Sequence, residues 1–158
     1  MNRKVKRGSA IELAGDEFIK AIGQAMVAFA GIEGLLNLHL QSMLKNPIVW
    51  KHLANIPVSK RLDIYSDLLI QSGFPSERIK EMISSANSLF KKRNIIAHSP
   101  MVTTGDPPEK FVMQQSTREL LTAEDITLIA IKADEVYDQV WQLFWEEKFS
   151  DHRMQDHA

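Results

Sequence analysis

The sequence predicts an all-α protein, an antiparallel bundle of four to five helices with a small β-hairpin or extended flap after the third helix. Four stretches carry apolar residues at the 3.6-residue period of an α-helix. The breaks between them contain Pro47, Pro57, Pro75 and Pro100, and proline tends to end a helix. After Pro100 the pattern changes to two short β-like runs on either side of residues 105–108, which read Gly-Asp-Pro-Pro.

Length and composition fit one compact domain. The chain has 158 residues, enough to build a hydrophobic core of its own. Hydrophobic residues make up 44% and charged residues 25%, as in an ordinary soluble globular protein. We divide the chain into a flexible basic arm at residues 1–13, a single helical domain at residues 14–149 and a polar tail at residues 150–158.

Charge and cysteine content restrict the classes of function. The formal net charge is −1, so any binding to nucleic acid has to use a local basic patch. There is no cysteine, which excludes disulfides, thiolate metal sites and a cysteine nucleophile. We find neither a signal peptide nor a stretch that approaches a membrane span, and we expect a cytoplasmic protein without a membrane partner.

The first long helix is expected over residues 15–44. Its apolar residues keep the helical period, and acidic residues lie in its first turn, where they suit the helix dipole. Gly23, Gly31 and Gly34 weaken an isolated helix but would let another helix pack closely. Glu33 lies in the most apolar part of this helix, so its carboxylate needs either a cation or solvent.

The second helix is expected over residues 58–71, with Ser59 as its N-cap. Lys60 and Arg61 lie in its first turn, the unfavourable end of the helix dipole for a cation. We interpret them as candidate substrate-binding residues that face an anion, the alternative being two solvated surface charges. Residues 48–53, before this helix, are expected to form a short apolar connection.

Two further helices are expected over residues 76–98 and 122–148. Ser76 is the expected N-cap of the first of these. Thr122 and Asp125, three residues apart, are expected to form a capping box at the start of the last helix.

The third helix ends in a cluster of polar residues, Arg93, Asn94 and His98, shortly before Pro100. Asn94 and His98 are four residues apart and share a face of the helix. Arg93 and His98 are five apart and diverge by roughly 140°. One helix cannot easily aim both side chains at one small target, whereas two copies of the helix could.

Arg93 also interrupts an apolar stripe on the third helix. A buried arginine is costly unless it is paired, so we expect Arg93 to meet Glu33. The alternatives are a purely structural ion pair, a snorkelling arginine, or a Glu33 that faces solvent. Lys91 and Lys92 flank Arg93 on a more exposed side and are further candidates for substrate binding.

The order of helices and the motif at residues 93–98 together resemble the HEPN superfamily. Its signature is an arginine, a polar residue and then a histidine, with four to six residues between the arginine and the histidine. Asn94 occupies the polar slot, and the spacing from Arg93 to His98 is the shortest form. The resemblance covers residues 15–148 as an order of helices but only residues 93–98 as a motif.

What the resemblance implies is a homodimer in which the motif helices of two copies line one cleft. Many members are metal-independent endoribonucleases without a cofactor, which implies catalytic roles for Arg93, Asn94 and His98 and a supporting role for Glu33. Histidine can move a proton from the ribose 2′-hydroxyl or to the leaving 5′-oxygen. Arginine can hold the phosphate and its growing negative charge.

The biological setting implied by the resemblance is a bacterial toxin–antitoxin or defence system, with an antitoxin or regulator protein as a partner. Members that are silenced through a tyrosine two residues after the histidine differ from this chain, which has Pro100 there. Other members bind RNA, nucleotides or proteins without cutting, so a non-catalytic dimeric binding or regulatory module is the alternative. A third possibility is an interaction protein in which Arg93, Glu33 and His98 only stabilise a buried interface.

Overall fold

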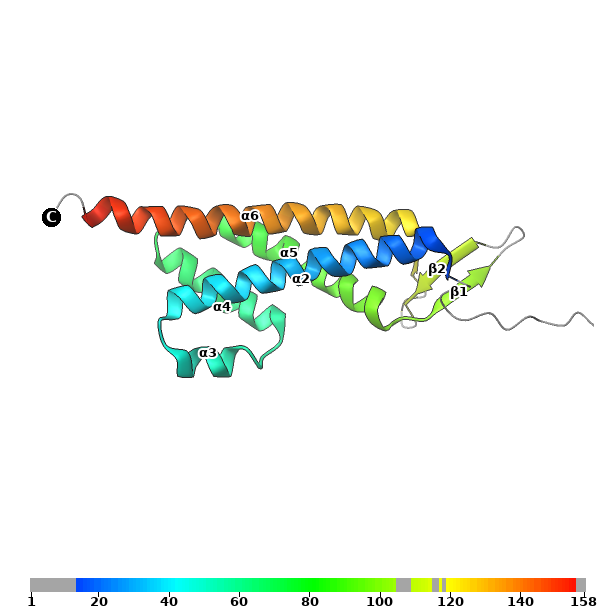
Figure 1. Ribbon diagram of the computed structural model, residues 1–158, viewed down its shortest axis with the longest axis horizontal. Helices are drawn as coiled ribbons and strands as arrows, with labels where there is room; N and C mark the ends of the chain where they lie inside the picture. The colour runs from blue at the N-terminus through cyan, green and yellow to red at the C-terminus, as the bar shows by residue number, and fades with distance from the viewer. Residues whose placement is uncertain (1–13, 105–108, 115–116, 118, 156–158) are drawn as a thin grey trace, which may run out of the picture.

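The computed structural model describes residues 14–104, 109–114, 117 and 119–155. Within them the chain forms five helices and a small antiparallel sheet of three strands (Figure 1). The helices are α2 (Asp16–Leu44), α3 (Pro47–Leu53), α4 (Val58–Gln71), α5 (Ser76–His98) and α6 (Ala123–Gln155). The predicted arm at residues 1–13 and the turn at residues 105–108 lie outside the described residues.

The predicted helices over residues 15–44, 58–71 and 76–98 are confirmed to within one residue at each end. The last helix is longer than expected and continues to Gln155, into the segment assigned to a polar tail. The apolar connection after Asn46 is itself a short helix, because the Asn46 side chain accepts hydrogen bonds from the backbone nitrogens of Ile48 and Val49.

Helix capping is confirmed at one of the three predicted positions. The Thr122 hydroxyl accepts a hydrogen bond from the Asp125 backbone nitrogen, and the Asp125 carboxylate accepts one from the Thr122 nitrogen. Ser59 and Ser76 do not act as N-caps, since α4 starts two residues and α5 one residue earlier than those caps require. Pro57 and Pro75 occupy the cap positions, and neither makes a side-chain cap bond.

The predicted hairpin is confirmed and gains a third strand. β1 (Met101–Thr104) pairs antiparallel with β2 (Glu109–Met113), with Met101 opposite Val112. β3 (Leu120–Leu121) pairs with the other edge of β2. Val112 and Leu121 are buried, so the sheet covers the end of the core beside the first turns of α2 and α6 (Figure 1).

Successive helices reverse direction along the chain (Figure 1). Arg61 contacts Glu33 while Tyr65, one turn later, contacts His39, so α2 and α4 run in the same direction. Contacts of α2 with Tyr137 and then with Glu147 show that α6 is parallel to them as well. α3 and α5 run the other way, and α3 returns the chain to the side where α4 begins (Figure 1).

α2 is the most apolar helix of the described residues. It is long and apolar enough to cross a membrane by length and composition alone, although we predicted no such stretch. The difference arises because residues 21–32 contain no charged side chain and Glu33 is an isolated charge. Phe18, Ala25, Phe29, Ile32 and Leu36 of this helix are buried in the core, and the side of α2 away from them is exposed.

Candidate functional site

The C-terminal end of α5 holds the polar cluster that the sequence singled out. α5 ends at His98 because Ser99 takes an extended conformation ahead of Pro100, with φ −94° and ψ 145°. The Ser99 backbone nitrogen still donates to the Ile95 carbonyl oxygen at 3.0 Å, which closes the last turn. His98 is therefore the last helical residue, and β1 begins only three residues later.

The three side chains of this cluster are accessible. Asn94 and His98 are exposed, and Arg93 is part-buried. Nη1 of Arg93 donates a hydrogen bond to Oδ1 of Asn94 at 3.2 Å. This contact joins the arginine to Asn94, which is four residues from His98 and lies on the same face of α5.

Arg93 does not pair with Glu33, contrary to our prediction. The ring centroids of Phe29 and Phe90 lie 5.4 Å apart. These two residues therefore lie at the same position along the bundle axis, where the antiparallel helices α2 and α5 are in contact. Moving from Phe90 to Arg93 along α5 leads toward the start of α2, whereas Glu33 lies beyond Phe29 in the opposite direction. The predicted apolar stripe of α5 is buried as far as Phe90. Beyond it, Arg93 is only part-buried and Ala97 is exposed, so this end of the stripe does not face the core.

Arg61 is the actual partner of Glu33. Its guanidinium donates to the Glu33 carboxylate through Nη2 and to the Asn37 amide oxygen through Nη1. Arg61 is only 5% exposed, which corrects its assignment as a substrate-binding residue: it is committed to a buried contact between α4 and α2. Lys60 is exposed and lies 3.6 Å from Asp63, one turn along its own helix.

The lysines beside Arg93 differ in their surroundings. Lys92 forms an ion pair with Glu119, which precedes β3 and so ties the end of α5 to the sheet. Lys91 is exposed and forms no ion pair within the part of the chain that the structure describes. Lys91 is therefore the freer of the two, although it lies about 200° around α5 from Arg93 and does not share a helix face with it.

Sequence reasoning missed a second polar cluster around His39. This side chain is fully buried, and its Nδ1 is hydrogen-bonded to the Tyr65 hydroxyl at 2.7 Å. Its Nε2 lies 3.6 Å from the Glu147 carboxylate. Burial, and then the positive charge of Lys148, lower the pKa of His39 to about 4, so the ring is neutral at pH 7. The only signal in the sequence is a histidine within an apolar run, Leu36 to Leu40.

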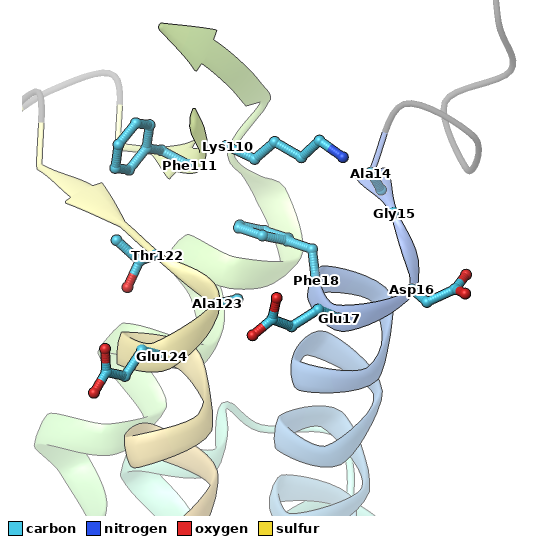
Figure 2. A pocket seen from close by; sticks show the side chains of 10 residues that line it. All are labelled: Ala14, Gly15, Asp16, Glu17, Phe18, Lys110, Phe111, Thr122, Ala123 and Glu124. Atoms are coloured by element: carbon cyan, nitrogen blue, oxygen red, sulfur yellow. The ribbon is translucent and has the colours of Figure 1, made fainter. Parts of the chain in front are cut away.

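A cavity of about 630 Å³ lies between the first turns of α2 and α6 and is closed on one side by β2 of the sheet. Figure 2 shows Lys110 extending from β2 toward Gly15, with Glu17 and Phe18 on one side and Glu124 on the other. A side chain at Gly15 would meet Lys110 Nζ at 2.8 Å, and φ of Gly15 is +75°, so glycine is required there. None of the residues predicted for the site lines this cavity.

Metal ligation has no candidate group here: across the described residues, no three His, Cys, Asp or Glu side chains gather closely enough to hold an ion. No family model matches the chain, and no curated protein or solved structure does so either.

Proposed function

We propose that this protein is a metal-independent endoribonuclease with a HEPN-like helical bundle, acting at the end of α5 as a homodimer. The observation that carries the proposal is the exposure of His98 and Asn94 beside Arg93, on a helix that ends at the histidine. Arg61 and His39, which have the same side-chain chemistry, are instead buried and held by partners inside the chain.

The charge around the cluster supports an anionic substrate. Between Met82 and Met113, the charged side chains that the structure describes are Lys91, Lys92, Arg93, Lys110 and the titratable His98. Lys92 is paired with Glu119 and also acts on the Asp125 carboxylate, and Lys110 lies in the cavity that Glu17 and Glu124 line. Among the described residues of α5, Lys91 and Arg93 form no ion pair, and we propose that they supply the positive charge for a phosphate.

The proposed chemistry divides between the three side chains. His98 takes the proton of the ribose 2′-hydroxyl, or returns one to the leaving 5′-oxygen. Arg93 holds the phosphate and the charge that develops on it, and Asn94 orients the guanidinium through the bond already present. The products are a 2′,3′-cyclic phosphate and a 5′-hydroxyl, and DNA resists because it lacks the attacking group.

The test is RNA cleavage by the purified protein in excess EDTA. An RNA strand and the DNA strand of the same sequence are compared, together with an RNA that carries a single 2′-deoxy position at the main cut site. We expect cutting of the RNA alone, loss of that one cut in the substituted strand, and cyclic phosphate ends. Cutting that needs a divalent metal, or equal cutting of DNA, would contradict the proposal.

A second candidate function is a non-catalytic binding module in a toxin or defence system. It is favoured by one observation: Arg93, Asn94 and His98 line none of five cavities found among the described residues. The same RNA then binds in a His98-independent way and is not cut. A second copy of the chain is what would turn the exposed motif into a cleft.

A further inference from the structure

The cavity between the starts of α2 and α6 is separate from the motif at the end of α5. Its volume of about 630 Å³ is in the range of roughly 300–1,000 Å³ that is usual for small-molecule sites. The residues before α2, the first turn of α2, strand β2 and the link from β3 into α6 all contribute to its lining. Several separate segments thus enclose one space, as in a binding site built by the fold.

Lys110 is the cation of this cavity. Figure 2 shows its side chain extending from β2 toward Gly15, where a side chain on the glycine would meet Nζ at 2.8 Å. Lys110 is half-buried, and its ammonium has no ion-pair partner among the described residues. A partly desolvated ammonium without a partner gains free energy when an anionic group binds to it.

Glu17 supplies the opposite charge. Figure 2 shows its carboxylate pointing toward Ala123 at the start of α6, whereas the carboxylates of Asp16 and Glu124 point away. Glu17 has no ion-pair partner among the described residues either, and it is not paired with Lys110 although both line this cavity. The cavity therefore presents one cation and one anion that do not neutralise each other.

An aromatic surface lies between these two charges. The ring of Phe18 is between the side chains of Lys110 and Glu17 in Figure 2, and Phe18 is only 4% exposed. Phe111, next to Lys110 on β2, is part-buried and contributes a second ring to the lining. Aromatic rings favour a ligand with an apolar or aromatic body, which packs against them.

The charges of the lining disfavour most classes of small ligand. A plain anion would be attracted by Lys110 but repelled by the carboxylates, and a plain cation would be repelled by Lys110. An uncharged apolar molecule would remove Lys110 and Glu17 from water without giving them partners, which costs free energy. The carboxylates do not form a metal site, since no three His, Asp or Glu side chains of the described residues gather closely enough.

We propose that this cavity binds a small zwitterion with an apolar body. The carboxylate of the ligand pairs with the Lys110 ammonium, its ammonium pairs with the Glu17 carboxylate, and its apolar side chain packs against Phe18. Free amino acids with a large side chain and short peptides share this chemistry. The site goes beyond the proposed function and does not depend on it, because none of the motif residues lines the cavity.

Calorimetric titration of the complete chain tests the class of ligand. The probes are L-phenylalanine, phenylalanyl-phenylalanine, N-acetyl-phenylalanine, which lacks the ammonium, and phenylalanine amide, which lacks the carboxylate. We expect a zwitterion to bind with a Kd below about 1 mM. Both blocked compounds should bind at least about tenfold more weakly, because each leaves one charged side chain unpaired. The tighter of the two zwitterions distinguishes a free amino acid from a peptide as the source.

Two variants assign the charges. Lys110→Met keeps the apolar stem but removes the ammonium, so phenylalanine and phenylalanine amide should bind equally weakly. Glu17→Gln should remove the preference for phenylalanine over N-acetyl-phenylalanine in the same way. Lys51→Met and Glu135→Gln are the controls, because both residues are exposed and lie outside this cavity. They should keep the wild-type order of affinities, and circular dichroism checks that all four variants are folded.

Amide chemical shifts of the wild-type protein give a readout that needs no variant. On addition of L-phenylalanine, the largest changes are expected at Gly15, Phe18 and Ala123. Changes centred on Val27 and Ile131, which line the groove between α2 and α6, would place the ligand elsewhere and overturn the proposal. Absence of binding by both zwitterions at about 10 mM, or equal affinity for the blocked compounds, would overturn it as well.

The outcome is independent of the ribonuclease, since none of these measurements contains RNA. A zwitterion that binds here in a protein that never cuts RNA supports this site and contradicts only the proposed function. A protein that cuts RNA but gives the same order of affinities in Lys110→Met and in the wild type contradicts only this site.

Discussion

The protein places an arginine, an asparagine and a histidine in each of two regions, with opposite consequences. Between α2 and α4, Arg61 bonds Asn37 and Glu33 in the protein interior, and His39 one turn away bonds Tyr65. At the end of α5, the one hydrogen bond of Arg93 among the described residues is with Asn94, and His98 is exposed. Similar side chains thus stabilise the fold where partners and burial surround them, and remain available for a ligand where the helix ends.

The largest effect is expected from His98→Ala. A histidine that transfers protons contributes roughly 10²–10⁴-fold to rate, so RNA cleavage should fall by that factor. Because His98 is exposed and is not packed in the core, the melting temperature should remain within about a degree. Cleavage assays and thermal melts measure the two effects.

His52→Ala is the matched control, since His52 is also exposed but lies on α3, far along the chain from the motif. It should change neither cleavage nor melting. A His98→Ala protein that unfolds, or one that keeps full metal-free cleavage, would show that His98 is structural.

The second prediction compares how much Arg61 and Arg93 contribute to stability and to RNA cleavage. Glu33→Ala leaves the buried Arg61 guanidinium without its carboxylate, and breaking such a pair costs about 3 kcal/mol, at the low end of the range because Glu33 is partly exposed. Arg93→Ala should cost less than about 1 kcal/mol, since Arg93 has no ion-pair partner among the described residues, but it should abolish cleavage. Urea unfolding and RNA cleavage assays on both variants show which arginine stabilises the fold and which is needed for cleavage. Equal destabilisation by the two variants would remove the distinction.

The third prediction concerns pH and the buried His39. Its pKa is lowered to about 4 in the folded protein by burial and by Lys148, whereas the unfolded chain keeps 6.5. The unfolded state therefore binds the extra proton first, and stability present above pH 6.5 is lost as pH falls toward 4. Between about pH 7 and about pH 5 the loss is roughly 2 kcal/mol. Tyr65, whose pKa is raised by burial and by Glu147, remains protonated throughout.

His39→Gln retains a polar group near the Tyr65 hydroxyl but does not titrate. At neutral pH its unfolding free energy should be lower than that of the wild type. Between about pH 7 and about pH 5, however, this free energy should change less than that of the wild type. His98→Ala should leave the wild-type pH dependence of stability in place. If His39→Gln and the wild type show parallel pH profiles, protonation of His39 does not control stability.

Much of this fold could be predicted because helix ends are local. Periodicity and proline located α2, α4 and α5, and the spacing of Thr122 and Asp125 located the start of α6. The partner of Arg93 could not be found in this way. Periodicity shows which face of α5 is buried, but the level at which α5 meets α2 depends on contacts such as Phe29 with Phe90.

The sequence also could not predict which charged residues are buried. Lys60 and Arg61 are neighbours of like charge in the sequence, yet one is exposed and the other is buried because α4 turns by about 100° per residue. The sequence also gives no sign that α4 runs parallel to α2, since that depends on the path of the chain through α3. Site residues on one helix were therefore predictable as a group, and pairs between helices were not.

The smallest effect is expected at the start of α6, where the capping box provides a local test of the same contrast. Thr122→Ala removes the hydroxyl that accepts from the Asp125 nitrogen, leaving one donor of the first turn unsatisfied, and should cost about 1 kcal/mol. The hydrogen bonds from Thr122 also hold the pKa of Asp125 below its usual range, so this cost should shrink as Asp125 becomes protonated in acid. Ser76→Ala is the control, because Ser76 is the first residue of α5 and makes no cap bond, so its replacement by the better helix former should leave stability unchanged within a few tenths of a kcal/mol. Urea unfolding at neutral pH compares the two variants. An equal change at both positions would mean that the reciprocal bonds of Thr122 and Asp125 do not set the stability of this helix start.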